Sequence, residues 1–237
     1  MKKTSTISVF NHIYANNLWH DPDSKSGTGS NLVQTSVIRE EIPKLINQFG
    51  IRTMLDAPCG DFFWMKEIKE ELRKKLDQYY GGDIVSELVQ RNKQQYADGQ
   101  FKFLQLDIIN DHLPKVDLIF CRDCLVHLSY QDIYRVLKQF KESGSVYLLT
   151  TIFTGDRLNK NIKTGDWRPL NLLNSPFNFP QPLLIINENC TEDKGIYADK
   201  SLGLWKLSTI STWTLMLYLM KLKLKALKAI ISNSRSK

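Results

Sequence analysis

Apolar and polar positions alternate along this chain in a pattern that predicts strands separated by helices. Apolar runs of strand length lie at residues 51–55, 78–84, 101–107, 116–121 and 146–151, and two more follow at 183–187 and 201–207. Helical spacing lies between them at residues 31–49, 61–76, 85–96 and 129–140, and near the end at 209–231. This alternation predicts an α/β protein with a doubly wound, mostly parallel seven-stranded sheet and helices on both faces, a Rossmann-like fold.

Polar residues and glycines mark several of the predicted helix ends. Ser129 is placed to cap the helix at 129–140, because its hydroxyl can accept from a free N–H group of the first turn. Asp61 stands in the same position before the helix at 61–76. Gly50 ends the helix at 31–49, and Pro43 inside that helix predicts a break or a kink.

Composition divides the chain into three parts. Residues 1–30 are polar and contain Trp19 and a Ser/Gly-rich run at 24–30, which is either a lid over a ligand or a disordered leader. Residues 31–208 carry the alternating pattern of a single domain, and residues 209–237 form a basic amphipathic helix and tail. Four cysteines in 237 residues do not indicate a disulfide framework, so we expect a cytoplasmic location.

The basic charge of the chain is concentrated in its tail. The net charge is +7, and the residues from Ser211 onward contribute six basic side chains and no acid, which leaves +1 for everything before them. A nucleic-acid groove needs its charge on the folded domain, so we expect no nucleic-acid partner. The apolar part of the tail is too short to span a bilayer. It either contacts an anionic membrane surface or docks on the domain or on a second subunit.

Three acidic residues stand at or just beyond the ends of successive predicted strands. They are Asp56, Asp83 and Asp107. Ligands of doubly wound sheets bind outside the carboxyl ends of the strands, so these carboxylates are expected to converge on one crevice. Carboxylates repel a pyrophosphate and suit a ligand with a cation or hydroxyl groups. Asp83 lies where an acid can bind the hydroxyls of a ribose.

The turn after the first strand reads Leu55-Asp56-Ala57-Pro58-Cys59-Gly60-Asp61, with Trp64 following. This stretch resembles motif I of the class I S-adenosylmethionine-dependent methyltransferases, in which an acidic residue precedes glycines at alternate positions. Asp56 holds the acidic position and Gly60 the middle glycine, whereas Pro58 and Phe62 replace the flanking glycines.

The resemblance implies a set of residues that bind S-adenosylmethionine (SAM). Around the methionine half it implies Asp56, Ala57, Pro58, Gly60, Asp61 and Trp64; at the ribose, Asp83 and Ile84; at the adenine, Asp107 and Ile108; and near the sulfonium, Cys121 and Arg122.

The segment after the fourth strand carries candidates for acid–base chemistry. His127 or Asp123 can serve as the general base that a hydroxyl acceptor needs, although His127 can equally be a packing residue. Cys121, Cys124 and His127 also have a spacing that invites a zinc site, but a fourth ligand is missing from the segment, and we expect no metal.

The long loop at residues 152–182 is the candidate acceptor site. Trp167, Arg168 and Asn171 combine an aromatic face with polar donors, which suits a sugar. The sequence Gly-Asp-Trp-Arg-Pro-Leu-Asn in this loop resembles that of a methyltransferase branch found with bacterial cell-surface polysaccharide genes. We therefore expect an SAM-dependent O-methyltransferase acting on a sugar, a glycan or another small molecule in polysaccharide biosynthesis. The alternatives are a nucleotide-dependent sugar-modifying oxidoreductase and a non-catalytic nucleotide-binding accessory protein at the membrane.

Overall fold

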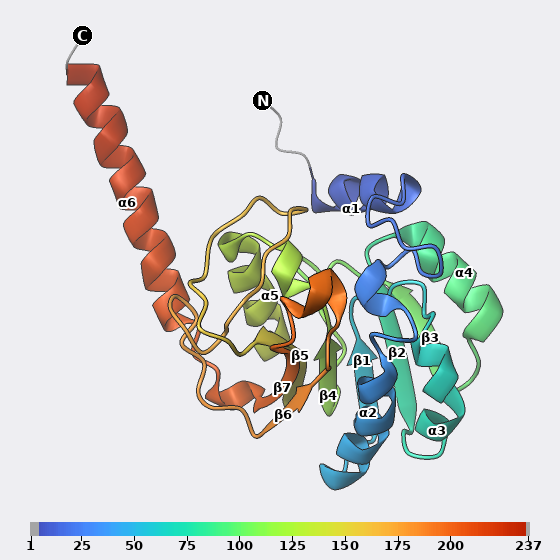
Figure 1. Cartoon of the computed structure of the whole chain (residues 1–237). Helices are drawn as coiled ribbons and strands as arrows, with labels where there is room; N and C mark the ends of the chain where they lie inside the picture. Colours follow the sequence, from blue (N-terminus) through green and yellow to red (C-terminus); the bar gives the residue numbers. More distant parts are fainter. Residues whose placement is uncertain (1–4, 236–237) are drawn as a thin grey trace.

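The computed structural model describes residues 5–235, with side chains up to residue 228 (Figure 1). Residues 1–4 and the last residues of the predicted tail lie outside the described part. Seven strands form one sheet in the order β3-β2-β1-β4-β5-β7-β6. Their bounds are β1 Thr53–Asp56, β2 Gln78–Asp83, β3 Phe101–Gln105, β4 Leu118–Cys121, β5 Tyr147–Phe153, β6 Leu184–Asn187 and β7 Lys200–Lys206.

The first five strands pair in parallel, whereas β7 pairs antiparallel with both β5 and β6. The predicted seven-stranded α/β fold is therefore confirmed, and the sheet is mixed. The long loop at residues 154–183 leads from β5 to β6, and the chain reverses direction between β6 and β7, which are consecutive antiparallel strands joined by a short connection.

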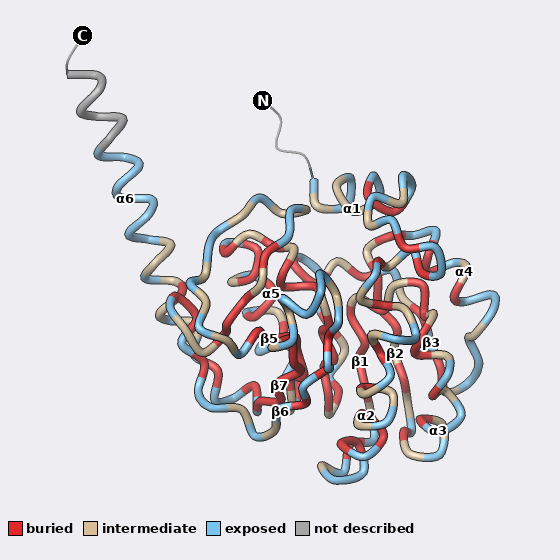
Figure 2. The backbone as a smooth tube through the Cα atoms, in the orientation of Figure 1, coloured by how far each residue is buried: buried red, intermediate tan, exposed pale blue. Residues whose placement is uncertain are grey.

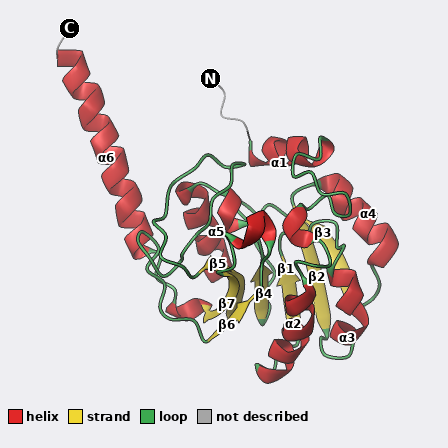
Figure 3. Cartoon of the chain, viewed as in Figure 1, coloured by secondary structure: helices red, strands yellow, loops and turns green. Residues whose placement is uncertain are grey.

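Helices cover both faces of the sheet (Figure 3). The α-helices of the described residues are α1 Thr6–Ala15, α2 Ser36–Gln48, α3 Lys69–Arg73, α4 Ser86–Tyr96, α5 Tyr130–Glu142 and α6 Trp213–Arg235, of which α6 extends away from the sheet (Figure 1). Neighbouring residues of one strand point to opposite faces. Met54 accordingly packs with the buried side of α2, and Leu55 packs with the buried side of α5. Figure 2 shows the resulting buried layer along the strands.

Two local predictions about helices are wrong. The helix expected at residues 61–76 is only a 3-10 turn at Met65–Ile68 followed by the short α3, because Gly60 and Phe62 have left-handed backbone angles (φ 55° and 58°) that no helix can contain. Of the break or kink expected at Pro43, the break does not occur, since α2 runs through this position with Ile42 and Leu45 buried on either side.

Other expected helix ends agree with the structure. Ser129 caps α5, accepting a hydrogen bond from the backbone N–H of Asp132 at 3.2 Å. α2 ends just before Gly50.

The N-terminal residues are folded against the domain. α1 packs Tyr14 with Val85 and Leu88 at the start of α4. The run at 24–30 is an ordered segment with a 3-10 turn at Thr28–Ser30, so a disordered leader does not describe residues 5–30. Within residues 5–235, no helix combines the length and the apolar character that crossing a membrane requires.

Candidate active site

A cavity of about 580 Å³ lies at the carboxyl ends of the parallel strands. The strand order changes direction between β1 and β4, and a crevice at such a switch point is where doubly wound sheets bind ligands. The ends of β1, β2 and β3 supply one half of the lining and the ends of β4, β5 and β7 supply the other. Residues 6–30 cover it from outside the sheet. A volume of this size suits a ligand as large as a nucleoside derivative.

Asp56 lines this cavity at the end of β1 and is 3% exposed. Its Oδ2 accepts a hydrogen bond from the Tyr79 hydroxyl at 2.5 Å. Burial raises the pKa of Asp56 to about 8, against the opposing effect of the Tyr79 hydrogen bond and with a further contribution from the charge of Asp83. Ionised Asp56 is therefore poorly compensated by its protein neighbours.

Asp83 lies in the cavity wall at the end of β2, and backbone groups hold both of its oxygens. Oδ2 accepts from the N–H of Gly60 at 3.0 Å and Oδ1 from the N–H of Val85 at 2.9 Å. Burial still raises the pKa of Asp83 to about 6, although these hydrogen bonds oppose the shift. A ligand with hydroxyl donors and a positive charge would stabilise the ionised forms of Asp56 and Asp83. SAM has a ribose, a sulfonium and an ammonium group, so these residues fit it.

Asp107 stands two residues beyond β3, at the same edge. It is partly exposed and accepts from the backbone N–H of Ile109 at 2.9 Å. Ile84, Ile108 and Ile109 line the cavity beside it. A carboxylate at the rim of an apolar wall can accept from the edge of a flat heteroaromatic ring that lies on that wall.

The turn after β1 is fastened to the N-terminal segment. The Asp61 carboxylate accepts hydrogen bonds from the Ser24 and Ser26 hydroxyls and from the Lys25 N–H, each at 3.0 Å. The Asp61 N–H donates to the Ser26 hydroxyl at 3.0 Å. Asp61 thus holds residues 24–26 over the cavity instead of capping a long helix. Gly60 leaves the space that this contact needs, since a Cβ there would lie 2.2 Å from the Ser26 Oγ.

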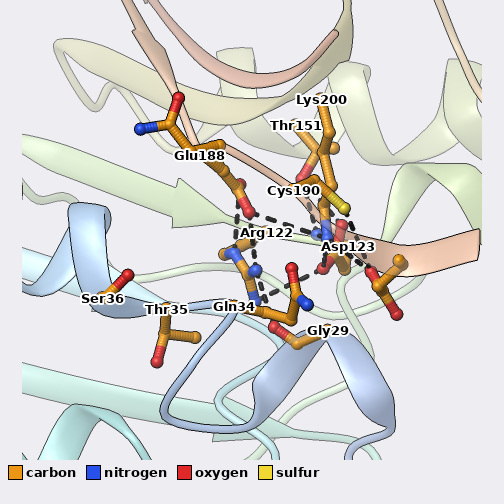
Figure 4. A network of polar contacts seen from close by, with 12 residues as sticks. Gly29, Gln34, Thr35, Ser36, Arg122, Asp123, Thr151, Glu188, Cys190 and Lys200 are labelled. Atoms are coloured by element: carbon orange, nitrogen blue, oxygen red, sulfur yellow. Dashed lines mark hydrogen bonds and ion pairs between the residues drawn. The ribbon is translucent and has the colours of Figure 1, made fainter. Parts of the chain in front are cut away.

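A buried network of charges joins β4, β7 and the N-terminal segment (Figure 4). Arg122 donates to both oxygens of Glu188, at 3.2 and 2.7 Å, and to the carbonyl of Gly29 at 2.8 Å. Lys200 donates to Asp123 at 2.7 Å. Arg122 lines the cavity, as expected, but most of its donors are already engaged by the protein.

This network determines the charge state of Asp123. Burial alone would raise the pKa of Asp123, but the positive charges of Lys200 and Arg122 lower it well below its usual range. Burial alone would lower the pKa of Arg122, and the carboxylates of Glu188 and Asp123 raise it instead. Asp123 is therefore a permanently ionised carboxylate with little tendency to take up a proton.

His127 lines the same cavity from the 3-10 turn at Leu125–His127. Its Nδ1 lies 3.1 Å from the carbonyl oxygen of Asp166, and a carbonyl can only accept, so Nδ1 carries the proton and Nε2 keeps a free lone pair. The ring centroid lies 5.1 Å from that of Trp19. Burial lowers the pKa of His127 to about 4, although the charge of Asp123 opposes the shift. The imidazole is neutral at physiological pH.

Aromatic side chains form a wall near His127 in the β4–β5–β7 half of the cavity. Trp167 and Tyr197 lie with ring centroids 5.0 Å apart, and Phe153 is 6.1 Å from Trp167. These rings and Trp19 all line the cavity. Trp167 is 42% exposed, so it is open to a ligand from outside.

The other two residues expected at the acceptor site lie outside the cavity lining. Arg168 is buried and donates to the carbonyls of Leu125 and Leu128 at 2.8 and 2.7 Å. Asn171 is buried and donates to the carbonyl of Gly155. Their donors were expected to face a sugar, but they bind backbone carbonyls and hold loops in place instead. We therefore leave them out of the acceptor site.

The remaining residues predicted at the cofactor divide in two groups. Pro58, Gly60, Asp61 and Trp64 line the cavity with the three strand-end acids. Ala57 and Cys121 are completely buried in the core, so their side chains do not reach it. Among the described residues, no three His, Cys, Asp or Glu side chains are grouped to hold a metal ion.

Several cavity residues were absent from the sequence prediction. They are Phe10, Tyr14, Ser26, Phe153, Glu192, Tyr197 and Lys200. The Ser/Gly run beside Trp19 gave a signal for the N-terminal ones, as a possible lid. No local signal marks Glu192 or Lys200, whose position depends on the pairing of β7.

The comparisons with known proteins agree with this geometry. Residues 55–143 match the model of a family described as a methyltransferase domain. An SAM-dependent methyltransferase from Leishmania major has the same fold, with a TM-score of 0.61 over 86% of each chain at 15% identity. The methyltransferase domain of bacterial CtHen1 gives 0.54 over 74% of this chain and 98% of that domain, at 11% identity. No curated protein sequence matches the chain.

A third solved structure is similar to this chain over part of its own length. Human N-acetylserotonin methyltransferase, solved with SAM, has 18% identity and a TM-score of 0.47, and the match covers 63% of this chain but 42% of the human one. The structural likenesses establish the fold, and residues 55–143 match a family of methyltransferase domains. Together with the lining of the cavity, these findings support an SAM-dependent methyltransferase with SAM as its cofactor.

Proposed function

We propose that this protein methylates a hydroxyl group of a sugar, a glycan or another small acceptor. The proposal rests on the neutral imidazole of His127. Its Nε2 has a free lone pair, and the residue lines the same cavity as Asp56 and Asp83. When bound, SAM supplies a methyl group on a positively charged sulfur. A hydroxyl acceptor must lose its proton as it takes up the methyl group, and His127 is the uncharged base near that reaction.

The strand-end acids and the turn after β1 form the proposed cofactor half. Asp83 accepts from the ribose hydroxyls, Asp107 and Ile108 border the adenine, and Asp56 faces the positive charge of the methionine half. Gly60, Pro58 and Trp64 shape the wall between them, and residues 24–26 close over it through Asp61. Excluding water from this half strengthens each of these polar contacts.

His127 and Asp123 have separate roles in this proposal. His127 takes the proton on Nε2, since its Nδ1 is committed to the carbonyl of Asp166. Asp123, paired with Lys200 and Arg122, stays ionised and stabilises the imidazolium that forms. We therefore propose His127, rather than Asp123, as the base.

The aromatic wall supports a sugar as the acceptor. Trp19, Trp167 and Tyr197 offer faces on which the apolar side of a sugar ring can lie, and the resemblance of the 152–182 loop to a polysaccharide-associated branch points to the same class. We propose that the reaction belongs to polysaccharide biosynthesis and takes place in the cytoplasm. Four unpaired cysteines fit that reducing compartment.

The test is a methyl-transfer assay on a panel of free sugars, nucleotide sugars and oligosaccharides, with S-adenosylhomocysteine as the measured product. His127→Ala is expected to lower the maximal rate by about 10² to 10⁴ and to leave cofactor affinity nearly unchanged. His112→Ala, at an exposed position outside the cavity lining, is the matched control. A His127→Ala enzyme that keeps most of its rate refutes the assignment of the base. Preferential binding of NAD, or cofactor binding without turnover on any acceptor, would instead favour the oxidoreductase or the accessory protein.

A further inference from the structure

The C-terminal helix α6 contacts the domain only through its first turns. Leu215 is 1% exposed, the Thr214 hydroxyl donates to the carbonyl of Phe177 at 3.1 Å, and the ring of Tyr218 lies 5.8 Å from that of Tyr130. From Met220 to residue 228 every residue is exposed. Figures 1 and 2 show this part of α6 extending away from the body as a free rod.

An exposed apolar stripe runs along α6 on the side opposite its docked residues. Its members follow each other at intervals of four, three, four and three residues, which places them on one side of a helix. They are Trp213, Leu217, Met220, Leu224 and Leu227, with exposed fractions of 61%, 37%, 52%, 56% and 55%. Leu215, half a turn away from Trp213 and Leu217, faces the domain. The stripe is thus left free when α6 docks.

Lysines border this stripe on both sides. Lys221 and Lys228 lie along one edge and Lys223 along the other, while Lys225 lies further round the helix, and all four are exposed. No acidic residue occurs from Ser211 to the end of the chain. Pairing with a second copy of α6 would place lysines against lysines at the positions that flank a coiled-coil seam. The surface that covers this stripe must therefore be negatively charged.

We propose that this face of α6, the five-residue stripe with its four lysines, binds the surface of an anionic lipid membrane. A flat surface accommodates lysines at several angles, because their long side chains reach the headgroups while the stripe enters the apolar boundary. An acidic partner helix would pair with Lys221, Lys223 and Lys228 but not reach Lys225. The contact holds the cavity near acceptors carried on the membrane, and it depends on neither the cofactor nor the acceptor chemistry.

The experiment is co-sedimentation of the full chain with vesicles of phosphatidylcholine alone or mixed with phosphatidylserine. The tail variant replaces Lys221, Lys223, Lys225 and Lys228 by Ser, and the control replaces Lys74, Lys93, Lys115 and Lys206, which are exposed on the body, by Ser. Each lysine near an anionic surface contributes about fivefold in partitioning, so the tail variant should bind the mixed vesicles several hundredfold more weakly. The control, with the same loss of four charges, should bind nearly as wild type.

A second variant separates the stripe from the charge. Met220→Ser with Leu224→Ser keeps every lysine and alters only exposed positions, and it should also bind the mixed vesicles at least tenfold more weakly. Equal binding to both kinds of vesicle, no binding to either, or an equal loss in the control variant overturns the proposal. So does a sedimentation velocity measurement in which α6 pairs two copies of the chain without lipid. Affinity for S-adenosylhomocysteine should stay unchanged in all variants, so failure here leaves the methyltransferase function untouched.

Discussion

Replacing Asp56 by Asn should stabilise the protein without cofactor at alkaline pH. The side chains have the same shape, and the Asn oxygen can still accept from the Tyr79 hydroxyl. The pKa of Asp56 is raised from 3.8 to about 8 by burial, so the folded protein holds a proton that the unfolded chain releases. This contribution to stability is fully present below pH 3.8, declines as the pH rises, and is lost above about pH 8.

The size of the effect follows from the shift. Four pKa units correspond to about 5 kcal/mol as an upper bound, and the new amide donor of Asn costs about 1–2 kcal/mol where it finds no acceptor. We therefore expect Asp56→Asn to raise the free energy of unfolding at pH 9 by at most about 3–4 kcal/mol. At pH 4 we expect no gain. Urea unfolding of wild type and variant at both pH values measures the difference.

Asp156→Asn is the matched control, because Asp156 is exposed. Its unfolding free energy should follow wild type at both pH values. If Asp56→Asn is destabilising at pH 9, or has the same pH dependence as wild type, then ionised Asp56 is well compensated and the reasoning is refuted. The same substitution should weaken SAM binding, since it removes the negative charge proposed to face the cationic half of the cofactor.

Three further predictions concern the lid, the charge network and the acceptor wall. Gly60→Ala places a Cβ 2.2 Å from the Ser26 hydroxyl at a φ of 55°. It should therefore lower the free energy of unfolding by about 1–2 kcal/mol and weaken SAM binding in calorimetry. An unchanged affinity would show that residues 24–26 do not contact the cofactor. Glu188→Leu leaves the buried Arg122 without its bidentate partner and should lower the free energy of unfolding in urea by about 3–5 kcal/mol. A much smaller loss would show that Asp123 alone neutralises Arg122. Trp167→Ala should raise the KM for a sugar acceptor about tenfold with kcat less affected, and an unchanged KM would remove Trp167 from the acceptor site.

The strands and their terminal acids were predictable because both are local properties of the sequence. A buried parallel strand reads as an apolar run, and an Asp at its end must lie at the ligand-binding edge once the sheet is parallel. Asp56, Asp83 and Asp107 follow this rule. The contacts that complete the site were not predictable in this way. Ser24 and Ser26 meet Asp61, and Lys200 meets Asp123, across 35 or more residues of sequence.

Residue type alone also failed where a polar side chain had two possible partners. Arg168 and Asn171 were expected to face a sugar, but the loops around them have carbonyls that their donors satisfy. A buried carbonyl without a partner costs as much as a lost ligand contact, and the sequence does not show which carbonyls lack one. Asp61 was likewise a reasonable helix cap, and the left-handed turn at Gly60 and Phe62 gave it a different partner.

The central claim is that Asp83 belongs to an SAM site at the carboxyl ends of β1 to β3. The most direct measurement is a calorimetric titration of S-adenosylhomocysteine and of NAD into wild type and Asp83→Asn, each first shown to be folded. Wild type should bind S-adenosylhomocysteine and not NAD. The variant should bind it about ten- to a hundredfold more weakly, because hydrogen bonds to a charged group contribute about 1.5–3 kcal/mol. Preferential binding of NAD by wild type, or unchanged S-adenosylhomocysteine affinity in the folded variant, would contradict the account.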